Sequence, residues 1–375
     1  MSQSRLCNLS KIPGKPFSEA LALSREVEEV VFLCYNEEGK YLSKRINTNL
    51  YVYTVPFRMK GSLLRTLVDM VRNLLFMSIF AAKITRKHRI NMIRAENIIL
   101  GGIPVIMSRL FQTARFAIWL AGSEDRVIRI RYGGGFLSKI TLTLFRCIRK
   151  YILSRAEFVV TVSDSCLAGL SRSEKKDIIH TPNFVDLESF TPSINTQRNN
   201  PFVFLYVGRL EHEKGVVELL SALRRIKSEK RFILKFTGWG TLQGEVECAA
   251  NEDSRIVMLG KLPHSDLPSV YQDADMLVLP SLTEGMPAVV LEAMASGIPV
   301  LATRVGQVPD VVSNGEHGLL VDSGSPEQLA DAMIWAIENQ TEIDKMKTSV
   351  RRKVVDLSGG YLELHKGIYR DLFGL

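Results

Sequence analysis

Residues 202–215 read FVFLYVGRLEHEKG, which is six apolar residues followed by a polar loop that begins and ends with glycine. An apolar run of this length next to Gly is typical of a strand that is buried on both faces. Amphipathic spacing then predicts a helix at Val216 to Ser228. The loop between them places Arg209 and Lys214 at the carboxyl end of the strand, where Arg can offer a fork of donors and Lys a point charge to phosphate oxygens. A solvated charged loop would have the same composition.

The same strand–loop–helix unit recurs through the C-terminal half. Strands that alternate with helices imply a parallel, doubly wound sheet, and ligands of such sheets bind at the carboxyl ends of the strands. Further strands are expected at Phe232–Thr237, Ile256–Leu259, Met276–Leu279 and Val300–Thr303, and helices at Leu267–Gln272, Ala288–Ser296 and Pro326–Gln340.

The N-terminal half shows a similar alternation, and the segment His180–Asn200, with two prolines and no periodicity, has the composition of a linker. We therefore predict two α/β domains, residues 1–182 and 183–375, that face a central cleft, with a last helix that packs back on the first domain. Strands are expected at Arg5–Leu9, Val30–Cys34, Leu50–Val55, Ile90–Arg94, Phe116–Leu120 and Phe158–Val162, and helices at Phe17–Glu29, Ser62–Arg86 and Leu137–Leu153.

The two halves differ in charge. Residues 1–183 contain 29 Lys and Arg against 14 Asp and Glu, a net charge of +15, whereas the remainder has 19 against 26, a net charge of −7. This asymmetry predicts an anionic partner for the first half, such as nucleic acid, anionic lipid or a phosphorylated substrate. No recognised nucleic-acid motif accompanies it, so we expect no nucleic-acid partner. The helix at Ser62–Arg86 and the basic run Lys83–Arg89 could lie on an anionic bilayer or could be a core-packed helix with a solvated basic end. The charge of the half favours peripheral membrane contact.

Apolar stretches and cysteines indicate where in the cell the protein is expected. The longest apolar stretch, Leu74–Ala82, is far shorter than the ~20 residues that cross a bilayer, and no apolar signal-peptide core follows Met1. The five cysteines are scattered and none has metal-ligand spacing, which fits a reducing cytosol and predicts no metal site.

Residues 283–294 read TEGMPAVVLEAM and follow the predicted strand that ends near Pro280. Pro287 suits the first turn of a helix, whose free backbone N–H groups and positive dipole end form a site for a diphosphate. Glu284 lies in the loop before the helix, and Glu292 lies about 7 Å along its axis. The two carboxylates could accept hydrogen bonds from different hydroxyl groups of one extended ligand. A capped helix with two surface glutamates is the alternative.

Several motifs in this order resemble the large family of retaining glycosyltransferases known as family 4. They are the Gly-Arg…Lys-Gly loop at 208–215, Thr-Gly-Trp-Gly at 237–240 and the two glutamates separated by seven residues. The segments PNFVD (182–186), GIPV (297–300) and EHGLLV (316–321) also look like family signatures, although Phe184 replaces the usual Gly. The resemblance covers residues 183–375 and implies the GT-B fold, two Rossmann-like doubly wound domains.

The resemblance also implies roles for individual residues. Arg209 and Lys214 would neutralise the donor diphosphate, Glu284 would hold the donor sugar, and Glu292 would bind the ribose. Family members retain the anomeric configuration and usually need no metal or other cofactor, so none is expected. Further donor-binding candidates are Gly208, Gly238, Lys261 and Leu262 near the base, and Gly285, Met286, Pro287, Ala288 and Val289 around the phosphates.

The first half resembles the family only loosely. The Gly-rich loop after the first strand is reduced to Lys11–Pro16, and Ala121-Gly122-Ser123 stands where many members carry a His. Glu96 and Asn97 are candidate acceptor-side residues, and a structural ion pair of Glu96 with Arg94 is the alternative. Residues 238–240 are expected to form a strand-to-helix turn, and the six histidines are expected to be surface or packing residues.

Together these observations predict a hexosyltransferase that uses a UDP- or GDP-linked sugar. The expected acceptor is a glycan or a lipid-linked molecule of cell-surface polysaccharide or lipopolysaccharide biosynthesis. The expected location is cytoplasmic, peripheral on the inner face of the membrane. A GT-B protein that binds nucleotide sugar but has lost the chemistry is the alternative. A two-domain epimerase is disfavoured because its carboxylate and His cluster is not evident.

Overall fold

The fold is described from a computed structural model of the 375-residue chain. It describes residues 30–36, 42–45, 48, 50–56, 63–90, 92–96, 98–120, 125, 129, 136–162, 167, 170, 178–181, 183, 185–193, 200–226 and 231–373. The strand expected at Arg5–Leu9 and the helix expected at Phe17–Glu29 lie outside these ranges.

The C-terminal half contains a six-stranded sheet in which every paired strand is parallel to its neighbour. The strand order is β10-β9-β8-β11-β12-β13, so the chain starts in the middle, winds to one edge and then returns to build the other side. This is the doubly wound order of a dinucleotide-binding fold, and its switch point lies between β8 and β11. The strands are β8 (Phe202–Val207), β9 (Phe232–Thr237), β10 (Ile256–Gly260), β11 (Met276–Leu279), β12 (Val300–Thr303) and β13 (Gly318–Val321).

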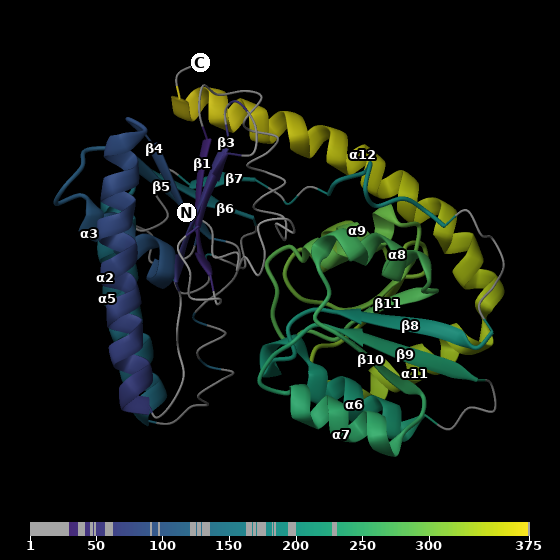
Figure 1. Ribbon diagram of the computed structural model, residues 1–375. Helices are drawn as coiled ribbons and strands as arrows, with labels where there is room; N and C mark the ends of the chain where they lie inside the picture. The colour runs from purple at the N-terminus through teal and green to yellow at the C-terminus, as the bar shows by residue number, and fades with distance from the viewer. Residues whose placement is uncertain are drawn as a thin grey trace.

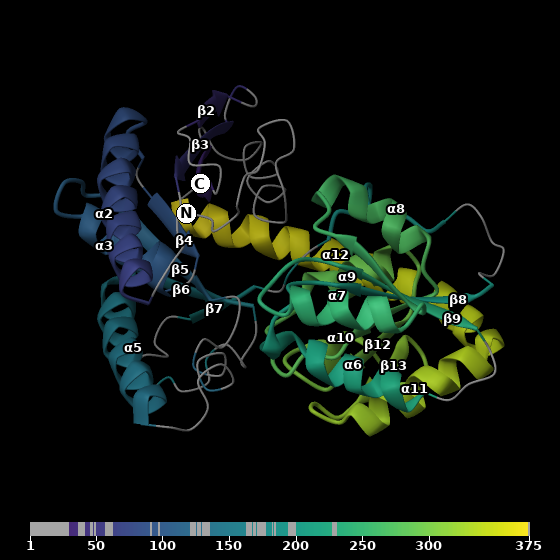
Figure 2. The same cartoon turned by 60° about the horizontal axis from the view of Figure 1, so that its bottom comes forward.

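Helices cover both faces of this sheet, which explains why β8, β11 and β12 consist of buried residues throughout. In Figures 1 and 2, α6 and α7 lie together on one face, and in Figure 1 α8 and α9 lie on the other. The helices are α6 (Val216–Arg225), α7 (Gln243–Glu252), α8 (Leu267–Gln272), α9 (Ala288–Ala295), α10 (Val308–Val311), α11 (Pro326–Glu338) and α12 (Gln340–Phe373), with short 3-10 turns at His212–Lys214 and His264–Asp266.

The N-terminal half contains two sheets. Four parallel strands have the order β4-β5-β6-β7, and a three-stranded sheet has the order β1-β3-β2, in which β2 is antiparallel to β3. The strands are β1 (Val30–Asn36), β2 (Leu42–Arg45), β3 (Leu50–Pro56), β4 (Met92–Glu96), β5 (Arg115–Leu120), β6 (Phe158–Thr161) and β7 (Ile178–His180). The helices are α2 (Leu63–Lys87), the π-helix η1 (Ile98–Gly102), α3 (Ile103–Ser108) and α5 (Phe136–Arg155).

The predicted strands of the described residues are present, with small shifts at their ends. The helix predicted to end at Ser228 ends at Arg225, because Ile226 adopts extended backbone and its side chain is buried. The strand predicted from Ile90 begins at Met92, after a turn in which Arg89 has a positive φ of 50°. Elements that the sequence did not predict are short or mostly polar: α7 buries only Val246 and Ala249, and β2, β7 and β13 have three or four residues.

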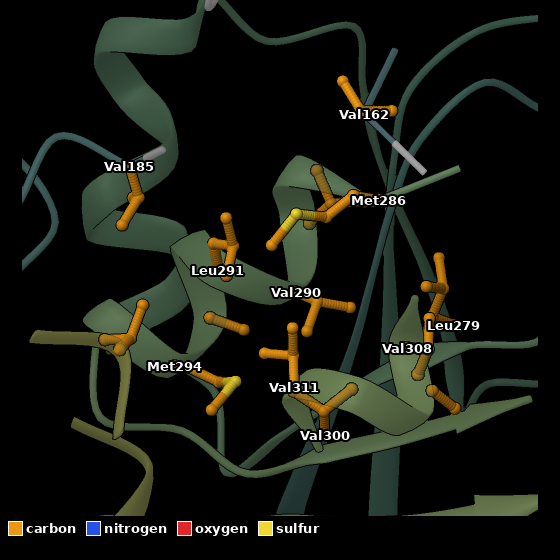
Figure 3. Close-up of a cluster of buried hydrophobic side chains, with 14 of the residues drawn as sticks. Val162, Val185, Leu279, Met286, Val290, Leu291, Met294, Val300, Val308 and Val311 are labelled. Carbon is orange, nitrogen blue, oxygen red and sulfur yellow. The ribbon is translucent and has the colours of Figure 1, made fainter. Parts of the chain in front are cut away.

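A shared hydrophobic cluster lies between α9 and the strands beneath it. Figure 3 shows Val290 and Met294 of α9 among Val300, Val308 and Val311. Val162, which follows β6 of the N-terminal sheet, belongs to the same cluster. The buried face of α9 is therefore fixed, and its N-terminus is held at the carboxyl edge of the sheet.

The last helix is long and is tied to the segment that joins the two sheets. The Arg351 guanidinium of α12 donates hydrogen bonds to the carbonyl oxygens of Phe190 (2.7 Å) and Leu187 (3.2 Å), and to that of Ala295 at the end of α9. In Figures 1 and 2, α12 continues from the second sheet toward the N-terminal strands. Packing of its end on the first domain stays a prediction, because side chains from residue 360 onward are not described.

Candidate functional site

The loops after β8 and β11 meet at the switch point of the second sheet. Lys214 lies in the first loop and Glu284 in the second, and the Lys214 Nζ is 2.6 Å from the Glu284 Oε1. The Ser281 hydroxyl donates to the same oxygen at 2.7 Å. Glu284 is 9% exposed, so the carboxylate is held by an ammonium and a hydroxyl at a nearly buried position. The structure thus brings together two of the three residues predicted to be catalytic.

Backbone packing keeps these two loops in register. Gly215 has a φ of 69°, and a Cβ at this position would lie 1.9 Å from the carbonyl oxygen of Pro280. The backbone N–H of Leu282 also donates to the carbonyl oxygen of Glu213 at 3.0 Å. A glycine is needed here both for the left-handed backbone and for the close approach of the two chains.

Arg209 begins the first loop but does not contact Glu284 directly. Its Nη2 donates to the Glu213 Oε1 at 3.0 Å, and the side chain is 51% exposed whereas that of Glu213 is 2% exposed. The Tyr206 hydroxyl donates to the Arg209 carbonyl oxygen at 2.7 Å. Burial, followed by the negative charge of Glu284, raises the pKa of Tyr206 well above its ordinary value. Tyr206 is therefore a hydrogen-bond donor at physiological pH and fixes the start of the loop.

The loops after β9 and β10 lie against the same edge. The Gly238 N–H donates to the Gly260 carbonyl oxygen at 2.9 Å, and a Cβ on Gly238, whose φ is 146°, would lie 1.7 Å from the carbonyl oxygen of Gly208. The Lys261 Nζ lies over the Trp239 ring, 5.2 Å from its centroid. The turn predicted at residues 238–240 is present, and the connection between β9 and α7 extends to residue 242. Gly238 thus allows its backbone to approach that of Gly208 closely, and Leu262 follows Lys261 at the start of the next loop.

The N-terminus of α9 points to this edge as well. Pro287 has extended backbone and precedes the helix, which begins at Ala288, so Pro287 is the N-cap rather than a residue of the first turn. The first N–H groups of such a helix have no carbonyl partner within it. Met286 is buried; the Asn183 side-chain amide donates to its carbonyl oxygen, and the Asn183 N–H donates to its sulfur at 3.2 Å. The helix start and Gly285 are therefore anchored to the segment that joins the two sheets.

Glu292 lies further along α9 and is held by two groups that the sequence did not single out. The Tyr271 hydroxyl donates to its Oε2 at 2.9 Å, and the His264 Nε2 lies 3.0 Å from its Oε1. Phe190 packs edge-on against both rings. Burial lowers the pKa of His264, but the hydrogen bond and negative charge of Glu292, with the charge of Asp186, outweigh this effect and raise the pKa above its ordinary value. No spacing in the sequence links these residues, because they meet only when α8 packs on α9.

The acceptor-side candidates are less clearly placed. Glu96 ends β4 and accepts a hydrogen bond from the Arg94 Nη2 at 3.1 Å, which is the ion pair that the sequence left as the alternative. The Arg94 guanidinium lies over the Trp119 ring, 4.2 Å from its centroid. Asn97 lies outside the described residues. The part of the chain described here contains no group of three His, Cys, Asp or Glu side chains arranged for a metal ion.

Comparison with known proteins fits this geometry. Residues 189–353 match the family model described as glycosyl transferases group 1. This segment, which is less than half of the chain, is similar to the glycosyl transferases group 1 family. The chain is 28% identical over 191 residues to the Escherichia coli UDP-Gal:alpha-D-GlcNAc-diphosphoundecaprenol alpha-1,3-galactosyltransferase, a match that covers 47% of this chain and 49% of the relative. It is 33% identical over 166 residues to a D-inositol 3-phosphate glycosyltransferase of Pseudarthrobacter chlorophenolicus, a match that covers 40% of each. The chain thus matches about half or less of the length of these curated relatives.

Solved structures extend the likeness to the whole chain at the level of the fold. Sucrose-phosphate synthase from Thermosynechococcus elongatus superposes with a TM-score of 0.76 at 20% identity, over 100% of this chain and 96% of the other. Anabaena HepE in complex with UDP and glucose superposes with a TM-score of 0.68 at 16% identity, over 100% and 98%. The predicted GT-B fold, α/β with two Rossmann-like domains, is confirmed.

Proposed function

We propose that this chain is a retaining hexosyltransferase of family 4 that uses a nucleotide diphosphate-sugar. The observation that carries the proposal is the 2.6 Å contact between Lys214 and Glu284 at the switch point of the second sheet. Ligands of doubly wound sheets bind at this point, outside the carboxyl ends of the strands. An ammonium, a helix N-terminus and a carboxylate at one such point provide groups for both a diphosphate and a sugar.

The proposed roles follow from the chemistry of the groups. Negative charge develops on the leaving nucleotide diphosphate, and Lys214, the exposed guanidinium of Arg209 and the first N–H groups of α9 would stabilise it. Glu284 would accept hydrogen bonds from donor-sugar hydroxyls, and Glu292 from the ribose hydroxyls. Gly208, Gly238, Lys261 and Leu262 would line the nucleotide side. We propose that these groups act without a metal ion or other cofactor.

The proposed donor carries UDP or GDP. A UDP-linked donor is supported by the E. coli relative, whose name specifies UDP-galactose, and by the Anabaena HepE structures with UDP and with UDP-glucose. The proposed acceptor is a glycan or a lipid-linked molecule, since the same relative is named for a diphosphoundecaprenol substrate, and a relative in Erwinia amylovora is named for amylovoran biosynthesis. Polysaccharide or lipopolysaccharide assembly at the cytoplasmic face of a membrane is the setting that we propose. Glu96 and Asn97 remain candidates on the acceptor side.

Donor binding is tested first, by a thermal-shift screen of the purified full chain against UDP-, GDP- and other nucleotide-linked sugars. A ligand that binds only the folded state raises the melting temperature by mass action, so the true donor should give the largest shift. Release of the free nucleotide diphosphate, with and without candidate acceptors, is then followed for that donor. Binding without release or transfer would favour the alternative, a GT-B protein that binds nucleotide sugar and has lost the chemistry.

The role of Glu284 is tested by Glu284→Ala, which we expect to abolish transfer while the fold persists. Glu245→Ala removes an exposed carboxylate of α7 in the same domain and serves as the matched control. Lys214→Met should lower kcat by roughly 100-fold to 1,000-fold, the usual cost of one donor aimed at developing negative charge. Full activity of Glu284→Ala would refute the assignment.

A further inference from the structure

The outer face of α2 carries five large apolar side chains that are exposed to solvent. Val68, Val71, Leu75, Phe76 and Ile79 are 59%, 54%, 44%, 49% and 62% exposed. They are spaced three or four residues apart or are adjacent in sequence, so they lie on one face of the helix. We call these five residues the α2 stripe. Contiguous apolar patches of this kind on a protein surface mark sites of contact with another apolar phase or surface.

The stripe is separate from the face by which α2 packs on its own domain. Leu74, Met77 and Ala81 are buried on the other side, and Met77 and Ala81 join a cluster with Leu33 and Tyr53. The core is therefore complete without the stripe. Figures 1 and 2 both place α2 on the side of the N-terminal half that faces away from the second sheet.

The exposed charged side chains beside the stripe are basic. Lys83 and Arg86 are exposed and continue the stripe toward the end of the helix, and Arg72 is exposed within it. Asp69 is the one carboxylate in the sequence of α2, and it pairs with Arg72 at 2.8 Å. The outer face of α2 therefore combines large apolar side chains with exposed cations.

A second helix adds to this surface. α5 lies with α2 and α3 in the layer on the outer side of the N-terminal half (Figures 1 and 2). Its side chains Ile140, Leu144 and Tyr151 are 49%, 61% and 53% exposed, and its sequence contains no acidic residue. Lys139 and Lys150 are exposed on it. Apolar and basic side chains thus recur on two helices of one layer.

We propose that the α2 stripe docks on an anionic lipid bilayer, with the helix parallel to the surface, the apolar side chains among the acyl chains and the cations at the headgroups. An amphipathic helix with Phe and Leu beside Lys and Arg has the composition that binds in this way. A second copy of the chain is a poorer partner, because residues 1–183 carry a net charge of +15 in each copy and like charges repel, whereas an anionic surface attracts them. Among the described residues, no helix is both long enough and apolar enough to span a bilayer.

The proposal assigns the membrane setting of the proposed function to the α2 stripe, and it does not depend on chemistry at the donor site. A protein with an inactive donor site would dock equally well, and an active transferase with a soluble acceptor would still bind vesicles. Docking would keep the N-terminal half at the surface in which a lipid-linked acceptor resides.

The test is flotation of the purified full chain with vesicles of phosphatidylcholine alone or with phosphatidylglycerol, over a series of NaCl concentrations. Wild-type protein should float with the anionic vesicles, and the bound fraction should fall with salt because the cations are exposed. Phe76→Gln with Ile79→Gln should weaken binding by at least about tenfold, since two large side chains no longer leave water. Lys83→Glu with Arg86→Glu should weaken binding to anionic vesicles by more than about fivefold per residue.

The matched control is Val217→Gln with Val355→Gln, which replaces two exposed apolar side chains of α6 and α12 and should leave flotation unchanged. Gln is a good helix former, so all variants should melt near the wild-type temperature, and a donor-induced thermal shift reports the fold independently. The proposal is overturned if the wild type does not float with anionic vesicles, or if the Phe76 and Ile79 variant binds as the wild type does. A wild-type dimer that becomes monomeric in that variant would also overturn it and would make the stripe a self-association surface.

Discussion

Replacing Tyr271 by Phe should destabilise the second domain more than replacing Tyr206 by Phe. Both rings are fully buried, and Phe fills nearly the same volume, so neither change leaves a large cavity. The Tyr271 hydroxyl donates to the carboxylate of Glu292 at 2.9 Å, whereas the Tyr206 hydroxyl donates to a neutral carbonyl oxygen at 2.7 Å. The pair therefore compares a charged with a neutral acceptor.

The magnitudes follow from that difference. A hydrogen bond to a charged group contributes about 1.5–3 kcal/mol to stability and a neutral one about 0.5–1.5 kcal/mol. Burial, and then the charge of Glu292, raises the pKa of Tyr271 well above its ordinary value, so the phenol keeps its proton at any assay pH near neutrality. We expect Tyr271→Phe to lower the free energy of unfolding by about twice as much as Tyr206→Phe. The phenyl ring that replaces the phenol of Tyr271 should keep the edge-on contact with Phe190.

The assay is urea unfolding followed by far-UV circular dichroism, with both variants compared with the wild type at equal m-values. If Glu292 binds the ribose as proposed, Tyr271→Phe should also raise the Kd of the nucleotide sugar, because the carboxylate loses the group that fixes its rotamer. A Tyr271→Phe variant that is no less stable than Tyr206→Phe would refute the reasoning about the charged acceptor.

Two further predictions concern the same edge of the sheet. Gly238→Ala should lower the free energy of unfolding by more than about 3 kcal/mol or prevent folding, because the new Cβ would overlap the Gly208 carbonyl oxygen at a φ that L residues rarely adopt. Gly244 of α7 is the control, because a Cβ there would meet nothing within 4 Å. In thermal unfolding, Gly244→Ala should be neutral or should stabilise the protein by about 0.5–1 kcal/mol. The pKa of His264 is higher in the folded protein than its unfolded value near 6.5, so protonated His264 stabilises the fold. This contribution is fully present below pH 6.5 and is lost as the pH rises through the higher folded pKa. The difference in the free energy of unfolding between wild type and His264→Gln should therefore shrink as the pH increases from 6.5 through the folded pKa. A difference that grows with pH would mean that the His264 ring does not pair with Glu292 in its charged form.

The sequence predicted much of the second domain because its strands are continuous apolar runs. β8, β11 and β12 are buried on both faces and were placed within a residue of their observed bounds. Two elements that are not continuous buried runs were not predicted. β13 begins with Gly and has a partly exposed residue within it, and α7 buries only two side chains.

The candidate site was predicted in part for a similar reason. Loops that follow parallel strands meet at one edge, so Lys214 and Glu284 could be placed at the same edge although they are 70 residues apart. Arg209 lies in the same loop as Lys214 and forms an ion pair with the buried Glu213, and its half-exposed guanidinium stays a predicted diphosphate ligand. Its place within four residues of Glu213 was visible in the sequence, but the direction of its guanidinium was not.

The sequence by itself determined the alternation of strands and helices, the loops that carry the charged residues, and the apolar and basic composition of α2. Only the tertiary structure decided that β8 and β11 are neighbours, that His264 and Tyr271 close on Glu292, and that the α2 stripe faces outward. The physical reason is that periodicity reports the geometry of one segment. Strand order and the rotation of a helix about its axis are set by packing between segments far apart in the chain.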